Sequence, residues 1–567
     1  MSAALGLRRR ARARDGELPA LKGSASKVLF LDCSARGLVE FPPGLLQLEH
    51  LEELHLEGNL IETLPSEIGL LRKLRVLYLQ GNRLERVCEE LGCLTQLLSL
   101  DLSGNPVADG QRLLLEVVQQ LRGLRELRLH GLGLTDLPDR ICKNLHRLEL
   151  LGLSENSLTA LPAAIVNLSH LREIYVKRNQ LEALPTGLGE LPRLEIVDAG
   201  QNLLAALPDE ACGPTWRKLF LGSNRVLALP GSLRKLGHLT VLDISQNRLT
   251  GLPRCFSTLT SLVELDLSDN PLRTLPPQVC LLTSLQVLYL RNTQLRGLHP
   301  NLSALQRMQV LDLSQNRFSK FPSEIFHLKN LEQLSLDDNQ LREIPVGIQM
   351  LPMLKCLGLT GNQFPSFPKA VCGLPSLERL YLGQDQGLKL TSVDESIAQL
   401  RNLRVLYIEN NSIECLPEAI GHLQMLEILD CHNNRLTTFP DALCCLNALK
   451  ELRLQGNCLS QLPLNLTKLQ ALEVLMLGGN PLTDPPAGVC DLGPAAVRQY
   501  LEEKARVLTK AVQVQAWWRG VMVRRRLGPF ASLGANEKGK RKQKKDKDRK
   551  KKPAAGNAKK GPTRKKK

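Results

Sequence analysis

Residues 51–65 read LEELHLEGNLIETLP and residues 74–84 read LRVLYLQGNRL, so leucine recurs at the same offsets and an asparagine follows in the same place. The frame recurs in 20 windows, most of them 23 residues apart. The windows begin at residues 28, 51, 74, 97, 124, 148, 171, 194, 216, 239, 262, 285, 308, 331, 354, 377, 403, 426, 449 and 472. A chain of 567 residues with this pattern is expected to be an array of stacked units rather than one compact core.

Each window predicts a short strand and a turn. After Leu51, the alternating Leu54 and Leu56 point into the core, while His55 between them points out. One unit cannot bury its apolar face alone, so parallel stacking gives a continuous core with every strand on one concave wall. An Asn in ninth place, expected to bond turn backbone groups, occurs in 16 of the 20 windows. The exceptions are Arg36, Leu132, Thr293 and Asp385.

The pattern resembles the leucine-rich repeat. Most units add Leu-Pro or Phe-Pro after the Asn, as at Leu64-Pro65 and Phe321-Pro322, and proline there favours an outer segment that is not a strand. This form is similar to the 23-residue repeats of intracellular Ras-pathway and polarity scaffolds. Over residues 28–494 the resemblance implies an α/β solenoid, a curved horseshoe of about 20 units with parallel concave strands and a wall that binds proteins.

Two steps of the repeat are longer than the others. The step from residue 97 to residue 124 spans 27 residues and contains the apolar run 113–121, which predicts a longer outer helix. The step from residue 377 to residue 403 spans 26 residues and passes through Gly383 and Gly387. A tolerated loop insertion explains both steps, and a hinge or a partner-specific projection is the alternative.

The fifth residue of each window faces out of the concave wall. Five of the six tyrosines stand there, and tyrosine is enriched at interfaces because it offers a large apolar surface at little entropic cost. Aspartates recur there too, and the neighbours Asp243 and Asp266 are expected to repel each other unless a basic partner or solvent relieves them. We therefore predict a concave protein-binding surface made of Tyr175, Asp198, Asp243, Asp266, Tyr289, Asp312, Tyr381 and Tyr407. There are two alternatives: that the tyrosines stand there only because tyrosine favours strands, and that the aspartates form a solvated acidic face without a specific partner.

No catalytic, cofactor-binding or metal-binding residue is predicted. The sequence has no nucleotide-binding GxxxxGK[ST] loop, HExxH zinc motif or GxSxG elbow, and its 15 cysteines lack zinc-ligand spacing. Many cysteines follow an aliphatic residue, as in Val279-Cys280, and are expected to be reduced core residues of an intracellular protein. No apolar run approaches the roughly 18 residues of a membrane span.

Beyond the last window, helix-favouring sequence without proline runs from residue 495 to Pro529. Residues 495–529 predict a capping helix that continues into a second segment, whose residues 514–527 read VQAWWRGVMVRRRL. This stretch resembles the IQ motif, with Val in place of the commoner Ile at its first position. The resemblance implies a helix that binds calmodulin or a calmodulin-like light chain, often without calcium, through Val514, Gln515, Trp518, Arg519, Gly520, Arg524 and Leu527.

The physical character of this helix agrees with that resemblance. Apolar residues recur at spacings near three and four, which gives a stripe that a hydrophobic groove can grip. Residues 511–535 contain four arginines and no acid, so an acidic partner is steered towards them. The alternative is a basic amphipathic helix that packs on the array or touches a membrane surface.

Residues 530–567 are expected to be a disordered, lysine-rich tail, because residues 536–567 hold 17 Lys and Arg, three acids and no aromatic residue. Its basic runs could bind phosphates, anionic lipid, acidic polypeptide tails or an import receptor. The alternative function is thus a tether to anionic polymers or a membrane surface through this tail. Sequence-specific nucleic-acid recognition is not expected, because aromatic stacking residues and a reading fold are absent.

The net charge of +17 divides unevenly along the chain. The basic N-terminal segment 1–27 contributes +5, residues 511–535 contribute +4 and residues 536–567 contribute +14, which leaves the array mildly acidic. We therefore predict a non-enzymatic scaffold in signal transduction, with an unknown protein on the concave face and a calmodulin-like protein on the helix. A cytoplasmic location is expected, and the basic tail allows nuclear entry.

Overall fold

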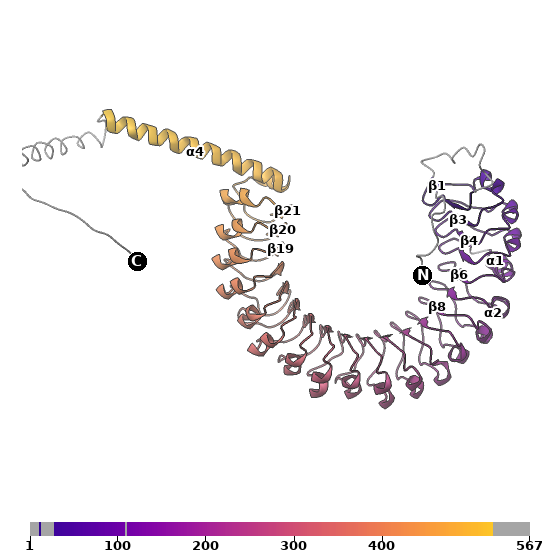
Figure 1. Cartoon of the computed structure of the whole chain (residues 1–567). Helices are drawn as coiled ribbons and strands as arrows, with labels where there is room; N and C mark the ends of the chain where they lie inside the picture. Colours follow the sequence, from indigo (N-terminus) through magenta and orange to yellow (C-terminus); the bar gives the residue numbers. More distant parts are fainter. Residues whose placement is uncertain (1–10, 13–27, 108–109, 526–567) are drawn as a thin grey trace, which may run out of the picture.

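The computed structural model describes residues 11–12, 28–107 and 110–525. These residues form a curved solenoid in which short strands line the inner side and helical turns lie on the outer side (Figure 1). Each strand pairs in parallel with the strand before it, as β3 pairs with β2 and β21 with β20. The predicted α/β solenoid with parallel concave strands is confirmed.

The strands are three residues long except for the first, which has two. They are β1 Ala11–Arg12, β2 Phe30–Asp32, β3 Glu53–His55, β4 Val76–Tyr78, β5 Ser99–Asp101, β6 Glu126–Arg128, β7 Leu150–Gly152, β8 Glu173–Tyr175, β9 Ile196–Asp198, β10 Lys218–Phe220, β11 Val241–Asp243, β12 Glu264–Asp266, β13 Val287–Tyr289, β14 Val310–Asp312, β15 Gln333–Ser335, β16 Cys356–Gly358, β17 Arg379–Tyr381, β18 Val405–Tyr407, β19 Ile428–Asp430, β20 Glu451–Arg453 and β21 Val474–Met476. Strand β1 precedes the first predicted window and extends the sheet at its N-terminal edge by pairing with β2.

The outer segments are mostly single 3-10 turns that begin directly after the proline of the Leu-Pro or Phe-Pro pair, since proline donates no N–H to a sheet. They span Pro43–Gln47, Ser66–Leu70, Glu89–Cys93, Ala163–Asn167, Thr186–Glu190, Asp209–Ala211, Gly231–Lys235, Arg254–Thr258, Pro277–Leu281, Pro300–Ala304, Ser323–His327, Val346–Met350, Lys369–Gly373, Glu395–Gln399, Glu418–His422, Asp441–Cys445 and Leu464–Lys468. Four segments are α-helices: α1 Gln111–Val118, α2 Asp139–Asn144, α3 Ala487–Cys490 and α4 Pro494–Arg525. Helix α1 confirms the longer outer helix predicted in the 27-residue step.

One apolar core runs the length of the array. Leu51, Leu54 and Leu56 are fully buried, and the same offsets are buried in unit after unit. Cys280 is buried beside Val279, as predicted, and all 15 cysteines are free thiols.

The ninth-place asparagines form a ladder of buried hydrogen bonds between units. The Nδ2 atom of Asn270 donates to the carbonyl oxygens of Ile244, Leu267 and Ser268 at 2.9, 3.0 and 3.2 Å, and its Oδ1 accepts from Leu249 N at 2.9 Å. The predicted bonding of turn backbone groups is confirmed. Each Asn therefore joins its own turn to the preceding unit.

We expect Asn270→Ala to lower the free energy of unfolding of the array by about 2–4 kcal/mol, because the change leaves several buried backbone groups without partners. The matched control is Asn330→Ala, since Asn330 is exposed and its Nδ2 donates only to Gln306 O, at 2.7 Å. Urea titrations followed by circular dichroism measure both variants. Equal midpoints for the two variants would contradict the structural role of the ladder.

The 26-residue unit breaks this pattern. In all the remaining units, the eighth residue has a positive φ. Gln384, the eighth residue of the 26-residue unit, does not. Its side chain is fully buried, and neither of its amide atoms has a hydrogen-bond partner within the described ranges. The next residue, Asp385, is exposed and accepts a bond from Asn410 Nδ2 at 2.6 Å. The insertion thus puts a glutamine, instead of the ninth-place residue, into the interior.

Helix α4 closes the C-terminal end of the core. Its first turns bury Val497 and Leu501 against the last unit, and the Tyr500 hydroxyl donates to Asp484 Oδ1 at 3.0 Å. The rest of the helix leaves the array and projects away from the horseshoe (Figure 1). No helix within the described ranges is both long enough and apolar enough to cross a membrane.

Candidate functional site

The last residue of each strand carries the side chain that was predicted to face the concave wall. Strand register places these residues side by side: Tyr175 pairs with Asp198, Asp243 with Asp266, and Tyr289 with both Asp266 and Asp312. Tyr381, on the strand next to Gly358, pairs with Tyr407 on the following strand. All eight predicted wall residues therefore lie in one row, in two groups separated by the stretch around Ser335 and Gly358.

The four tyrosines of the row are partly buried, and each has a raised pKa caused first by burial. The Tyr175 hydroxyl donates to Glu173 Oε2 at 2.9 Å, and burial together with that carboxylate raises the pKa of Tyr175 to about 12. Tyr381 and Tyr407 meet edge to face with ring centroids 5.2 Å apart. The rings therefore present neutral, largely fixed surfaces to a ligand.

The four aspartates of the row share one arrangement. In each, Oδ1 accepts a backbone N–H from two residues further on, at 3.2 Å for Asp198, 2.9 Å for Asp243 and 2.8 Å for both Asp266 and Asp312. Burial raises the pKa of Asp198 and of Asp266, and for Asp266 the nearby Asp243 adds to the increase. Within the described ranges, no aspartate of this set forms an ion pair. The expected repulsion is therefore not relieved by an ion pair within the array, although Lys177 acts on Asp198 from nearby.

Further polar side chains reach the wall from the ends of β19 and β20 and from the residues that follow the strands. Asp430, almost fully buried, accepts from Arg453 Nη1 at 3.2 Å, and its Oδ1 lies 2.6 Å from His432 Nδ1. Glu409 approaches the same group, and burial raises its pKa. Glu409 was not among the predicted wall residues, although its seventh place in the window, two residues after Tyr407, is a signal that could have found it.

A ladder of ion pairs follows one flank of the array, at the residue just before each strand. Arg404 and Lys450 both bond Glu427 at 2.7 Å, and Lys355 bonds Glu332 at 2.7 Å. Such pairs between partly exposed groups add little stability each, but they favour correct stacking of neighbouring units.

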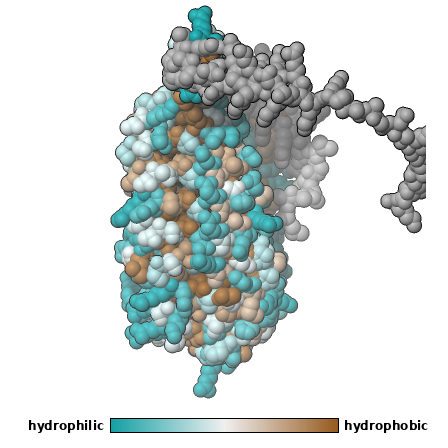
Figure 2. Space-filling model, turned by 90° about the vertical axis from the view of Figure 1, so that its left-hand side faces the viewer, coloured by the Kyte–Doolittle hydropathy of each residue, from teal (hydrophilic) through white to brown (hydrophobic). Residues whose placement is uncertain are grey.

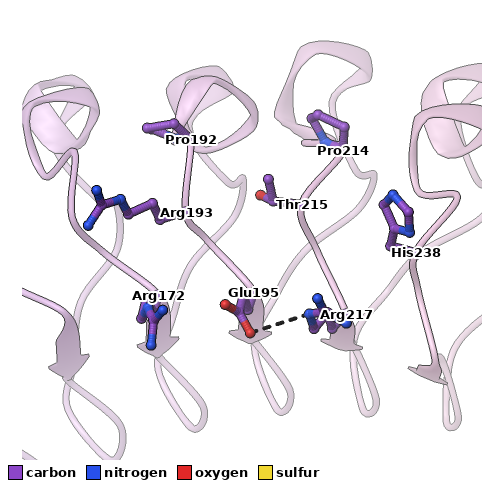
Figure 3. Close-up of a pocket in the computed structure, with 8 residues that line it drawn as sticks. All are labelled: Arg172, Pro192, Arg193, Glu195, Pro214, Thr215, Arg217 and His238. Carbon is purple, nitrogen blue, oxygen red and sulfur yellow. Dashed lines mark ion pairs between the residues drawn. The ribbon is translucent and has the colours of Figure 1, made fainter.

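A hollow of about 410 Å³ opens on the same flank. It is lined by Arg172, Pro192, Arg193, Glu195, Pro214, Thr215, Arg217 and His238 (Figure 3). Glu195 pairs with Arg217 at 3.4 Å, and the Thr215 hydroxyl donates to Leu194 O at 2.6 Å. The side chains come from separate units and do not converge on a common point (Figure 3). The hollow therefore assembles no recognisable catalytic group.

The outer surface has a mixed character. Figure 2 views the arm that carries α4 from its outer side, where hydrophilic side chains border a broken line of apolar ones. Among the outer segments, Val346 and Met350 are exposed apolar residues of one 3-10 turn.

The projecting part of α4 holds most of the residues predicted to bind calmodulin. Val514, Trp517 and Trp518 are exposed by 62%, 62% and 53%. Gln515, Arg519 and Arg524 are also exposed, whereas Gly520 is half-buried. Leu527 lies outside the described residues. The helix thus presents large apolar side chains and arginines that no part of the described array covers.

Comparisons with known proteins agree with this architecture. A leucine rich repeat family model matches residues 27–84, 49–107, 122–181, 214–272, 283–341 and 306–364, and a leucine-rich repeat region model matches residues 390–493. Together these matches cover more than half of the chain.

Two similar curated relatives are the mouse and human proteins called leucine-rich repeat and IQ domain-containing protein 4. The mouse protein is 47% identical over 149 residues, which are 26% of this chain and 24% of the relative, and the human protein is 46% identical over 149 residues, 26% of each. The chain thus matches about a quarter of the length of these relatives.

Solved structures show the same fold. A leucine-rich-repeat protein of Leptospira interrogans is 29% identical with a TM-score of 0.54, and the comparison covers 81% of this chain and 92% of that one. The Arabidopsis receptor kinase HAESA, in complex with the peptide hormone IDA and the co-receptor SERK1, is 29% identical with a TM-score of 0.54, over 80% of this chain and 78% of that one. From its repeats, its fold and these matches, the chain belongs to the leucine-rich-repeat family.

Proposed function

We propose that this chain is a non-enzymatic intracellular scaffold with two separate binding surfaces, the concave row and the projecting part of α4. The uncovered apolar and arginine side chains of α4 are the observation that carries the proposal. A helix that leaves its domain with two exposed tryptophans has an apolar surface suited to the groove of a partner. The resemblance to the IQ motif supports calmodulin or a calmodulin-like light chain as that partner.

The concave row is proposed to bind a protein ligand with basic residues. Its support is the run of carboxylates without cationic partners between partly buried tyrosines, in a fold whose solved relative HAESA is in complex with a peptide hormone. Rings supply contact area, and unpaired carboxylates supply charge complementarity. Signal transduction and a cytoplasmic location remain parts of this proposal.

We expect the double change Asp243→Asn with Asp266→Asn to reduce recovery of the concave-face partner at least tenfold in affinity purification. Asparagine keeps the bond from the following turn, so the fold is retained while two negative charges are lost. The control is Asp101→Asn, because Asp101 stands at the same place of another unit and accepts from Ser103 N at 2.9 Å. Unchanged recovery of every partner by the double variant would remove the proposal.

The tether alternative depends on residues 530–567, which lie outside the described residues, so it remains a prediction from the sequence. A polyelectrolyte contact weakens steeply as salt rises and fails when residues 536–567 are deleted. Wall binding is expected to survive both treatments, so the two functions can be separated.

A further inference from the structure

Phe220, the last residue of β10, lies between two carboxylates on the concave wall. Its backbone pairs in register with Asp198 on one side and with Asp243 on the other. The three side chains line a hollow of about 90 Å³ together with Gly200 and Gly222. A Cβ at Gly222 would lie 2.7 Å from Asp243 Oδ2, so glycine is what allows that carboxylate to lean over β10.

In each of the two carboxylates, one oxygen accepts hydrogen bonds and the other accepts none within the described residues. Asp198 Oδ1 accepts from Gly200 N, and Asp243 Oδ1 accepts from the backbone and the hydroxyl of Ser245 at 2.9 and 2.6 Å. The Oδ2 atoms have no hydrogen bond within the described part of the chain. Lys177 also lines the hollow and offsets some of the negative charge, but it forms no ion pair with either carboxylate. A planar cation that stacks on the ring could bond both Oδ2 atoms.

The same arrangement recurs on the next three strands. Tyr289, the last residue of β13, pairs in register with Asp266 on one side and Asp312 on the other. A cation stands near this second triplet too: Arg291 follows Tyr289 by two residues, and it donates to Gln315 Oε1 at 3.2 Å instead of to either carboxylate. Both triplets therefore combine one ring with two carboxylates that form no ion pair within the described residues.

The spacing of the two rings selects a peptide register. Phe220 and Tyr289 stand three strands apart, which is about 14 Å at the usual distance between strands. An extended chain that crosses the strands covers about 13.6 Å in four residues, and residues four apart point to the same side. Side chains at positions i and i+4 of an extended ligand therefore reach both rings together.

We propose that the concave row recognises an extended segment of a partner protein with arginine at positions i and i+4, each guanidinium stacked on an aromatic ring between two aspartates. The inference rests on the proposed function, because it requires the row to bind basic ligands. Arginine fits better than lysine, since its planar group stacks on rings and donates to two acceptors at once.

The occupant is not this chain's own basic tail, because no two arginines of residues 536–567 are four apart. The run from Arg8 to Arg14 does have that spacing. However, Ala11–Arg12 form β1 at the edge of the sheet, and β10 is nine strands away, about 43 Å. The run cannot occupy its own row while β1 is in place.

Three fluorescein-labelled nine-residue peptides test the register by fluorescence anisotropy with the full chain at low salt. Each contains only Gly and Ser apart from two test residues, which are Arg at positions 3 and 7, Arg at positions 3 and 6, or citrulline at positions 3 and 7. We expect the first peptide to bind at least tenfold more tightly than the other two. The pair Asp198→Asn with Asp243→Asn should weaken it at least tenfold, and Asp101→Asn should not.

Each other result has a defined meaning. If the two arginine peptides bind equally and the aspartate changes weaken both, the i and i+4 spacing is wrong. The proposal that the row binds a basic ligand would still stand. Equal binding of the citrulline peptide, or binding of none, overturns the inference, while the purification experiment still decides the proposed function. Sedimentation of the chain alone should show a monomer. If the chain self-associates and the Asp198→Asn and Asp243→Asn pair abolishes this, the row binds a second copy of the chain. That result would overturn the proposal that a partner protein occupies it.

Discussion

Reversing the charge of Arg519 and Arg524 to Glu is expected to weaken calmodulin binding at least 100-fold, a loss of about 2.8 kcal/mol. Both side chains are exposed on α4 and match the two arginines of the IQ motif. The change replaces attraction to an acidic partner with repulsion and leaves the apolar residues of the helix in place. Isothermal titration of the full chain with calmodulin, once with chelator and once with calcium, measures the effect and its calcium dependence.

The matched control carries the same change of charge elsewhere on the same helix. Arg506→Glu with Lys510→Glu alters two exposed cations that precede residues 514–527. We expect this pair to lower the affinity less than tenfold. Equal losses for the two pairs would show non-specific charge attraction, and wild-type affinity of the Arg519 and Arg524 variant would remove α4 as the calmodulin site.

Leu501→Asp is expected to destabilise the C-terminal end of the array by about 3–5 kcal/mol, since it places an uncompensated charge in a fully buried position. Leu501 and Val497 cover the core of the last unit, and Arg498 Nη2 donates to Leu469 O at 2.8 Å beside them. Stability in a stacked array depends mostly on nearest neighbours, so the loss should be greatest close to the cap. Hydrogen exchange should show faster opening of β19–β21 than of β9–β14.

Leu508→Asp is the control for the cap, because Leu508 lies two turns further along the same helix and is 45% exposed. It should leave hydrogen exchange of β19–β21 unchanged. If Leu501→Asp also left those strands protected, the start of α4 would not be the element that seals the core.

The strands and the concave row were predictable because they depend on local spacing. Leu54 and Leu56 lie one residue either side of His55, and strand alternation alone puts them inside. Stacking in register then places equivalent residues side by side, as with Asp243 and Asp266. The exposed helix beyond the cap followed from a separate signal, a proline-free basic and apolar stretch.

Other features depend on contacts that spacing does not encode. Gln384 enters the interior because the inserted residues change the backbone conformation at the eighth place, whereas the sequence suggested Asp385 for the missing ladder position. The leaning carboxylate of Asp243 requires Gly222, which follows β10 by two residues and lies 21 residues earlier in the chain. Such cross-unit contacts appear only when neighbouring turns are placed in three dimensions.

Proximity labelling in cells tests most directly whether the chain is a scaffold with two independent binding surfaces. It compares wild type with a wall variant, Tyr289→Ala with Tyr407→Ala, and with a helix variant, Arg519→Glu with Arg524→Glu. We predict that the wall variant loses one group of neighbours and keeps calmodulin, while the helix variant loses calmodulin and keeps that group. Loss of the same neighbours by both variants, or of none by either, would contradict the account.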